Sequence, residues 1–322
     1  MFGAVSWTNI VVRSPGNLLI TDGVYSYTYD DEGQRTQRTR LSDGQTTDYV
    51  WDHRHRLTRV TVTTPGTGSG TVRTVDYAYD VFDRLVERSV SGTGLTTHRE
   101  GRLFDGDAVL AEYNPDTGSL TNRYVSGEAL DQVFAQYNTA NLSSPGESFA
   151  LTDLLGSVRA IQPIDHTSDE FSAPFADAPV FAEYDAWGNT VWKDAQVRPE
   201  ATLANGQTTD WTGRDSLFSW TGREYDPISG LQWNRARWYD PQVGRWLNDD
   251  PIGFAAGDTN LQRYVGNSPT NATDPSGLEL VPLGLENGQR IGTLDKSTMR
   301  VIRAVNDPDI DESQRLEVDV GK

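Results

Sequence analysis

The chain contains no cysteine, two methionines and only three lysines among its 28 basic residues. The absence of cysteine excludes a disulfide framework, a thiol nucleophile and any cysteine-ligated zinc or iron–sulfur site. Long apolar runs are also missing, because no stretch approaches the roughly 18 apolar residues that cross a membrane. The first residues show neither the basic segment nor the apolar run of a signal peptide.

Positive charge is in short supply as well. The 46 acidic residues outweigh the 28 basic ones, which gives a net charge of −18 and a pI near 4.5. Such an acidic chain argues against a general phosphate-binding surface, so we expect no nucleic-acid partner. Four scattered histidines offer no complete ligand set, so we expect no metal and no cofactor. The 10% of aromatic residues argues against simple disorder.

Strict alternation of apolar and polar residues is what the chain has in abundance. It runs through residues 24–29, 58–63 and 72–79, and Asp-Gly turn dipeptides stand at 43–44 and 105–106. This pattern is typical of antiparallel strands joined by tight turns. We therefore predict an all-β chain, with a single amphipathic helix over residues 295–306.

A short motif recurs, in which an aromatic residue precedes an aspartate and a turn. Its copies are Tyr29-Asp30, Trp51-Asp52, Tyr79-Asp80 and Tyr184-Asp185, and the first three aspartates are 22 and 28 positions apart. A period of 20–30 residues indicates one supersecondary unit that stacks repeatedly. We expect each aspartate to close its turn by accepting hydrogen bonds from backbone N–H groups, and each aromatic ring to cover the neighbouring hairpin.

A second pattern fills the later part of the chain. Seven of the nine tryptophans lie between residues 187 and 246. Between residues 226 and 275 there are four Asp-Pro pairs, which begin at Asp226, Asp240, Asp250 and Asp274. Arginines are interleaved with them, and arginine both stacks on rings and forks to carboxylates. The segment is predicted to form a rigid aromatic cap, because a repeat array needs its end closed. The interleaved arginines are Arg223, Arg235, Arg237 and Arg245.

These motifs resemble the RHS, or YD-repeat, proteins of bacteria, the C subunits of insecticidal toxin complexes, and teneurins. Residues 151–159 resemble the Asp-x-Leu-Gly-Ser-x-Arg element of that family. The RHS repeat-associated core is matched by Thr221–Leu231, Arg235–Pro241, Gly244–Leu247, Asp250–Gly253, Tyr264–Pro269 and Asp274–Leu278. The resemblance covers about residues 20–278.

The resemblance implies a partial spiral shell of antiparallel β-hairpins that is closed by the core as a cap. It divides the chain into YD-repeat hairpins (1–100), a continued β-shell with core-like elements (101–219), the RHS repeat-associated core (220–278) and a short variable tail (279–322). Three to four clear repeats are too few for a large closed shell. Since the opening residues also resemble the middle of a domain, we expect a C-terminal fragment of a longer product, an orphan core, or an open partial barrel that pairs with another chain.

The resemblance also implies self-cleavage directly after the leucine of Asp-Pro-x-Gly-Leu. The scissile bond would then join Leu278 to Glu279. Asp250 and Asp274 would be the catalytic residues, and Arg245 would orient them or stabilise charge. Two carboxylates that lie close together cannot both ionise freely, so one can serve as base and the other as proton donor. At most we expect an intramolecular aspartyl-type autoprotease and no enzyme that turns over.

Three functions remain open from the sequence. The first is a shell that encloses or delivers a toxin, with its own C-terminal segment, an enclosed toxin polypeptide or a second shell-forming chain as partner. The family places such a protein outside the bacterial cell or on its surface. The second is a non-catalytic cell-surface module that binds carbohydrate or protein through exposed tryptophan and tyrosine. The third is a truncated fragment without independent activity, since a 44-residue tail is too short for a compact enzyme.

Overall fold

A computed structural model describes residues 12–13, 17–66, 70–127, 132–139, 146–164, 180–194, 217–278, 281–286 and 289–292. Within them the chain is β-structure with three short 3-10 turns, as the alternation predicts. The helix expected over residues 295–306 lies outside the described residues, and so does Glu279. The division of the chain into four segments stays a prediction.

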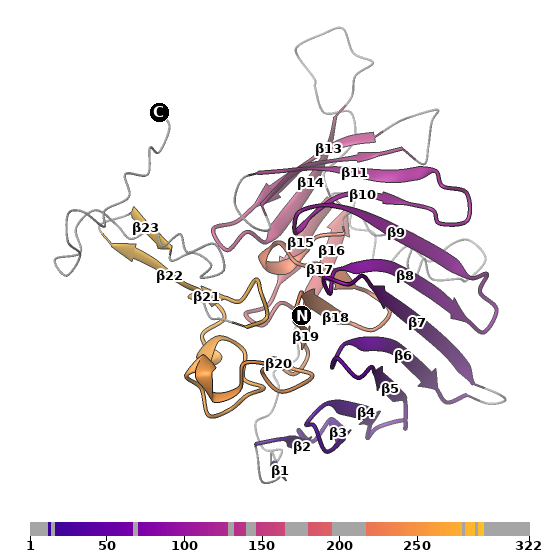
Figure 1. The fold of residues 1–322 in the computed structure, drawn as a ribbon, viewed down its shortest axis with the longest axis vertical. Helices are drawn as coiled ribbons and strands as arrows, with labels where there is room; N and C mark the ends of the chain where they lie inside the picture. Colours follow the sequence, from indigo (N-terminus) through magenta and orange to yellow (C-terminus); the bar gives the residue numbers. More distant parts are fainter. Residues whose placement is uncertain are drawn as a thin grey trace, which may run out of the picture.

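One sheet of 16 strands makes up most of the fold, and each strand pairs antiparallel with the next along the chain. The strands stack from β1 at the bottom of Figure 1 to β13 and β14 near the top. Their bounds are β1 (Val12–Arg13), β2 (Leu19–Thr21), β3 (Tyr25–Tyr29), β4 (Arg35–Arg40), β5 (Thr46–Trp51), β6 (Leu57–Thr64), β7 (Thr71–Tyr79), β8 (Leu85–Gly92), β9 (His98–Asp105), β10 (Ala108–Tyr113), β11 (Leu120–Ser126), β12 (Val133–Asn138), β13 (Gly146–Thr152), β14 (Val158–Ile164), β15 (Val180–Tyr184) and β16 (Thr190–Asp194).

The cap, defined here as residues 217–278, forms a second, four-stranded sheet and the turns around it. Figure 1 shows this segment beside the middle of the large sheet, while β22 and β23 extend away on the left. Its strands are β17 (Glu224–Asp226), β18 (Leu231–Asn234), β19 (Arg237–Asp240) and β20 (Arg245–Trp246), and its 3-10 turns are η1 (Trp220–Gly222), η2 (Gly253–Ala256) and η3 (Val265–Asn267). A third sheet joins β21 (Ala272–Thr273), β22 (Val281–Glu286) and β23 (Gln289–Gly292).

The hydrophobic core lies between the large sheet and the cap. Apolar residues of β5 to β8 pack against Leu231, Trp233, Trp238 and Leu247, and those of β10 to β14 pack against Leu217 and Phe218. A third cluster is internal to the cap and includes Trp220, Tyr239, Trp246 and Tyr264. The cap therefore covers one face along much of the sheet, because both parts bury aromatic surface there.

The repeated aspartates close their turns as the sequence predicts. In the copy at Asp52, Oδ1 accepts the N–H groups of Arg54 and Arg56, and Oδ2 accepts Nε of Arg56. The same pattern of two backbone donors recurs at Asp80, Asp153 and Asp185. Asp153 is therefore a further copy of the turn, which the sequence hides because threonine precedes it instead of an aromatic residue.

The aromatic residues of the motif reach back to the preceding copy, which confirms the predicted coverage. Trp51 donates from Nε1 to the carbonyl of Arg35 at 2.8 Å. Tyr79 donates from its hydroxyl to the carbonyl of Leu57, also at 2.8 Å. Both acceptors lie five residues after the preceding repeat aspartate. Each ring therefore links one turn to the next by a hydrogen bond at the equivalent position.

The fourth residue of each repeat turn has a positive φ, which glycine adopts at little cost. Gly33 and Gly188 occupy it in two copies, but His55 (φ 60°) and Asp83 (φ 63°) occupy it in two others. A non-glycine residue there costs about 1 kcal/mol. We predict that His55→Gly raises the stability of the chain by about 0.5–1 kcal/mol, after the entropy that glycine adds to the unfolded chain. The midpoint of urea unfolding should rise; an unchanged or lower midpoint would contradict the prediction.

Candidate functional site

All four aspartates of the Asp-Pro pairs are buried, with side chains that meet arginine. Asp226 and Asp240 bind arginines of the large sheet: Arg88 Nε lies 2.7 Å from Asp226, and Arg35 Nη1 lies 2.6 Å from Asp240. These two ion pairs join the cap to the sheet. Asp250 and Asp274 differ from them, because the described structure places both against Arg237, within the cap itself.

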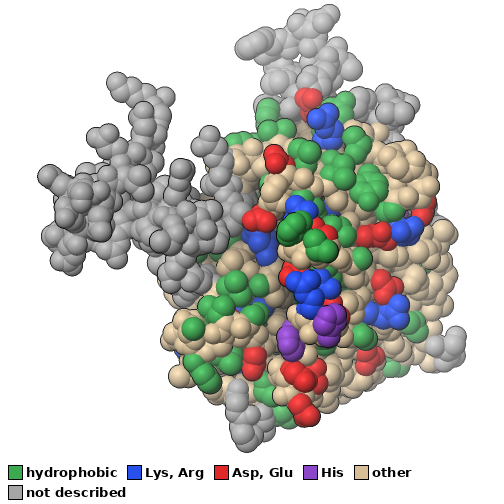
Figure 2. Space-filling view, viewed as in Figure 1, with side chains coloured by type: hydrophobic (Ala, Val, Ile, Leu, Met, Phe, Trp, Pro, Cys, Tyr) green, Lys and Arg blue, Asp and Glu red, His purple; other side chains and the backbone are tan. Residues whose placement is uncertain are grey.

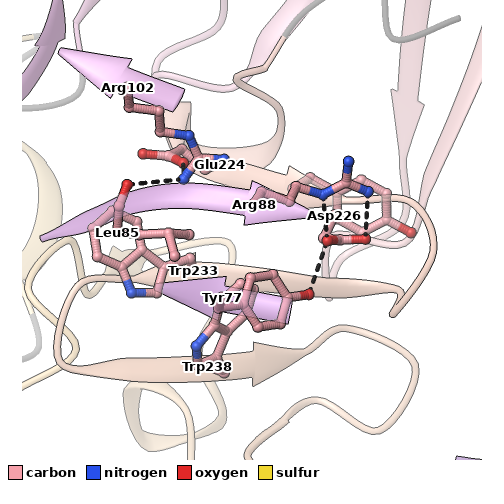
Figure 3. Close-up of a pocket in the computed structure, with 9 residues that line it drawn as sticks. Tyr77, Leu85, Arg88, Arg102, Glu224, Asp226, Trp233 and Trp238 are labelled. Carbon is pink, nitrogen blue, oxygen red and sulfur yellow. Dashed lines mark hydrogen bonds and ion pairs between the residues drawn. The ribbon is translucent and has the colours of Figure 1, made fainter. Parts of the chain in front are cut away.

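The contact at Asp226 shows what a purely structural pair looks like in this fold (Figure 3). Arg88 forks onto both carboxylate oxygens, and the Tyr77 hydroxyl donates to Oδ2 at 2.8 Å. Burial alone would raise the pKa of Asp226, but the Arg88 charge and these hydrogen bonds hold that pKa below its ordinary value. The adjoining cavity of about 10 Å³ has room for about one water molecule. This contact is therefore an anchor rather than a site for a substrate.

The predicted catalytic pair is brought together by one nitrogen atom. Arg237 Nη2 lies 2.9 Å from Oδ2 of Asp250 and 3.3 Å from Oδ2 of Asp274. Only 3% of Arg237 is exposed, and its guanidinium lies 4.2 Å from the centre of the Trp246 ring. The expectation that cap arginines stack on rings or pair with aspartates is thus confirmed here.

The charges around Arg237 differ from those at Asp240, where two arginines, Arg35 and Arg38, face one carboxylate. Two buried carboxylates face a single guanidinium, so holding both in the ionised form is unfavourable. Burial raises the pKa of Asp250 even though the Arg237 charge lowers it, and burial also lowers the pKa of Arg237. This arrangement favours one neutral and one ionised carboxyl group, which is what acid–base chemistry on a peptide bond requires.

Arg245, the arginine expected at the site, makes different contacts. Its Nη2 donates to the carbonyl of Asn17 at 3.0 Å and to Oδ1 of Asn260 at 3.1 Å. Its charge acts on Asp249, the neighbour of Asp250: burial raises the pKa of Asp249, whereas the Gln262 hydrogen bond and the Arg237 and Arg245 charges lower it. Arg245 therefore lies beside the pair, and Arg237 is the arginine that contacts it.

Asp249 also connects the site to the first repeat turn. Gln262 donates from Nε2 both to Oδ1 of Asp249 at 3.0 Å and to the carbonyl of Gly33 at 2.7 Å. A Cβ atom at Gly33 would lie 2.9 Å from Oδ2 of Asp249. The segment that carries Asp250 is thus fitted closely against a turn more than 200 residues earlier in the chain.

Four consecutive residues, 234–237, hold four consecutive carbonyl groups of the loop 274–278, and we call them the clasp. The loop is closed from inside as well, because Oδ1 of Asp274 accepts the N–H of Leu278 at 3.1 Å. The clasp therefore positions the segment that would be cut, residue by residue. Its contacts are Asn234 Nδ2 to Asp274 O (2.7 Å), Arg235 Nη1 to Pro275 O (2.6 Å), Ala236 N to Ser276 O (3.1 Å) and Arg237 Nε to Gly277 O.

Gly277 is the residue that lets the loop approach the clasp. Its φ is +72°, and a Cβ atom there would lie 2.4 Å from the carbonyl oxygen of Asn234 and 2.9 Å from the nitrogen of Arg237. Because both obstacles are backbone atoms, the loop itself must move when a side chain is added. If the chain cuts itself after Leu278, as the resemblance implies, we predict that Gly277→Ala lowers the rate of this cut at least tenfold while the large sheet stays folded.

Gel electrophoresis and intact-mass measurement of the freshly folded variant, next to circular dichroism, check this prediction. Gly253→Ala is the matched control, because Gly253 also has a positive φ (59°) in the cap but nothing lies within 4 Å of its Cβ position. Equal cleavage of Gly277→Ala and the wild type would contradict the role given to Gly277.

The predicted scissile bond lies inside a β-hairpin. Strand β21 ends at Thr273, just before Asp274, and strand β22 begins at Val281; the two pair through Ala272 with Pro282 and Thr273 with Val281. Leu278 is described and half-buried, whereas Glu279 lies outside the described residues. The bond after Leu278 therefore belongs to the connection between these two strands.

Comparison with known proteins is informative once this geometry is known. No family model matches the chain. It is 28% identical over 265 residues to the tRNA nuclease WapA of Bacillus subtilis, a match that spans 78% of this chain and 9% of that protein. It is 29% identical over 295 residues to the probable deoxyribonuclease RhsB of Dickeya dadantii, over 89% of this chain and 17% of that protein. The solved structure of TcdB2-TccC3 matches 79% of this chain and 14% of its own, with 18% identity and a TM-score of 0.51.

The chain is similar in sequence to RHS-type proteins of bacteria. Its large antiparallel sheet has the fold of the TcdB2-TccC3 β-shell. The chain spans only about a tenth to a fifth of the length of these two curated relatives. The part of the chain that the structure describes contains no helix long and apolar enough to cross a membrane, and no cluster of three or more potential metal ligands.

Proposed function

We propose that this chain is the C-terminal part of an RHS shell that encloses or delivers a toxin, and that it cuts its own backbone between Leu278 and Glu279. One observation carries the proposal: Asp250 and Asp274, both buried, share a single nitrogen of Arg237 at 2.9 and 3.3 Å, next to the clasped loop that leads to this bond. The proposal rests on the RHS-type sequence relatives and on this unbalanced charge cluster.

The reaction is a hydrolysis. Asp274 in its ionised form takes a proton from a water molecule, whose oxygen forms a bond to the carbonyl carbon of Leu278. Asp250, whose raised pKa favours the neutral acid, donates its proton toward the reacting amide. The C–N bond then breaks, which leaves a carboxylic acid on Leu278 and an amine on Glu279. The new acid passes its proton to Asp250, and Asp274 passes the proton that it took from water to the amine, so both aspartates return to their starting forms and the products are a carboxylate and an ammonium group.

The two arginines take separate roles in this proposal. Arg237 stabilises negative charge, because it touches both carboxylates and the carbonyl of Gly277 directly. Arg245 orients the segment that contains Asp250, because it holds Asn260 and acts on the neighbouring Asp249. Since the cut is intramolecular, each molecule would react once, and no turnover is expected.

Intact-mass measurement of the freshly purified full chain tests the proposal. Cleavage after Leu278 gives two masses, those of residues 1–278 and of residues 279–322, in place of 35.7 kDa. A second sample, isolated under denaturing conditions directly after synthesis, shows whether the cut follows folding. A single uncut mass in protein that unfolds cooperatively would overturn the proposal.

Partners and location are part of the same proposal. The enclosed material would be the chain's own C-terminal segment or a toxin polypeptide, within a shell completed by further repeats or by a second chain, outside the bacterial cell or on its surface. The carbohydrate-binding alternative depends on exposed rings, yet Trp220, Trp233, Trp238 and Trp246 are at most 3% exposed. These four cap tryptophans are therefore unable to stack on a sugar, and the enclosing shell is the better supported function.

A further inference from the structure

The contacts of the clasp end at a defined residue of the loop. The four contacts advance one residue at a time and stop at Gly277, because the next residue after Arg237 is engaged elsewhere. Trp238 pairs with Trp233 in the cap sheet, accepts the N–H of Leu247 at 3.0 Å, and donates from Nε1 to the Tyr79 hydroxyl at 3.0 Å. The carbonyl of Leu278 is therefore the first one beyond the clasp.

We propose that the clasp selects the bond that is cut, with Asn234 and Arg235 as positioning residues. This inference rests on the proposed self-cleavage. The four carbonyls of residues 274–277 are held individually, so the chain cannot slide by one residue without exchanging all four donors. The carbonyl of Leu278, the first one beyond these four, is then the one presented to the carboxyl groups, so the bond between Leu278 and Glu279 is cut.

Glycine at position 277 strengthens this selection. A slip by one residue would bring Ser276 or Leu278 to the place where a Cβ atom meets backbone within 2.4 to 2.9 Å. Only a residue without a side chain fits there, so the loop has one register. None of these contacts involves the side chain of Leu278. The position of the cut is therefore determined by the backbone contacts and by Gly277 more than by the identity of residue 278.

Arg235→Gly tests the role of the clasp without straining the backbone. Arg235 has a φ of 57°, which glycine adopts more easily, so the substitution removes the donor to the Pro275 carbonyl and leaves the backbone relaxed. His55→Gly is the matched control, because it also replaces a positive-φ residue in a turn but lies in the large sheet. Arg235→Lys keeps a positively charged donor and serves as the conservative rescue.

The readout is the position and the rate of the cut in the full chain during cell-free synthesis, followed by mass spectrometry of both products. We expect Arg235→Gly to be cut at least tenfold more slowly, with a second product whose end is displaced from Leu278. Asn234→Ala should behave alike, Arg235→Lys should recover most of the rate, and His55→Gly should match the wild type.

The outcomes separate the two proposals. If Arg235→Gly and Asn234→Ala are cut at the wild-type rate and only after Leu278, while Asp274→Asn stays intact, the clasp does not select the bond but self-cleavage stands. If the wild type itself stays whole, both proposals are overturned. Circular dichroism and urea unfolding of each variant show that a slow cut comes from a folded protein.

Discussion

Asp274→Asn leaves the folded chain in one piece. Asparagine keeps the size of the side chain, so the hydrogen bond from the Leu278 N–H can persist, but it removes the group that takes a proton from water. Acid–base groups typically contribute a factor of 10² to 10⁴ in rate. We expect the cut, complete in the wild type after folding, to slow by at least 10² in Asp274→Asn and in Asp250→Asn, as measured by gel and intact mass over hours.

The matched control is Asp258→Asn. Asp258 is also a cap aspartate bound to arginine, 2.6 Å from Arg263, but its side chain is 23% exposed, against 6% for Asp250 and 4% for Asp274. It should be cut at the wild-type rate. Normal cleavage of both Asp250→Asn and Asp274→Asn would remove the carboxyl pair from the reaction, even if the chain is still found in two pieces.

The stability of Asp250→Asn should separate its chemistry from its packing. Because burial raises the pKa of Asp250 in the folded chain, the folded state binds more protons than the unfolded chain above the ordinary aspartate value. The free energy of unfolding of the wild type therefore falls as the pH rises above the ordinary pKa of aspartate. Relative to the wild type, Asp250→Asn should gain stability as the pH rises above the ordinary pKa of aspartate, the sign expected of a residue kept for reaction rather than for folding.

Arg88→Met is expected to have the largest effect on stability. The Arg88 side chain is 1% exposed and forks onto Asp226, which is itself buried between the large sheet and the cap (Figure 3). Methionine fills the space but leaves the carboxylate unpaired, which typically costs about 3–5 kcal/mol. Urea unfolding at pH 7 measures this loss, and the cap should separate from the sheet first.

Two further variants make this test specific. Arg59→Met removes an exposed ion pair with Asp76 and should cost less than about 1 kcal/mol. The double variant Arg88→Met with Asp226→Leu should recover part of the loss, because the buried carboxylate is removed together with its partner. Glu100, the second and less buried carboxylate beside Arg88, loses its contact in both variants. The loss in Arg88→Met should also shrink on acidification, since the pKa of Asp226 is held low only by its partners. A loss as small as that of Arg59→Met would show that the pair does not anchor the cap.

Much of this fold follows from local chemistry that the sequence displays. Alternation predicts the strands. The aspartate turns at Asp52 and Asp80 form as their spacing indicates, because the hydrogen bonds that each aspartate side chain accepts come from residues within five positions of it. Figure 2 shows acidic and basic side chains next to one another on the viewed face, as the alternating strands lead one to expect. The turn at Asp153 is not recognisable as a repeat in the sequence, since its backbone pattern does not depend on the aromatic residue that marks the other copies.

The site is predictable only in part. The Asp-Pro motif indicates Asp250 and Asp274, but four such pairs look alike in sequence, and only tertiary packing decides which arginine each one meets. Arg237 is visible as one of several cap arginines, yet its contact with both carboxylates requires strand β19 to lie against residues 13 and 37 positions further on. Arg245 is nearer to Asp250 in sequence but turns to Asn17 and Asn260, a difference that no local rule reveals.

The contact between Gly33 and the Asp249–Gln262 pair indicates at which stage of folding the cut would occur. Gln262 meets a residue 229 positions earlier, and contacts of such separation form late in folding. The carboxyl pair is then completed only after the first repeat turn has found the cap. A cut after Leu278 would thus occur only in molecules whose first repeat turn has packed against the cap. The broken bond would distinguish completely folded molecules from incompletely folded ones.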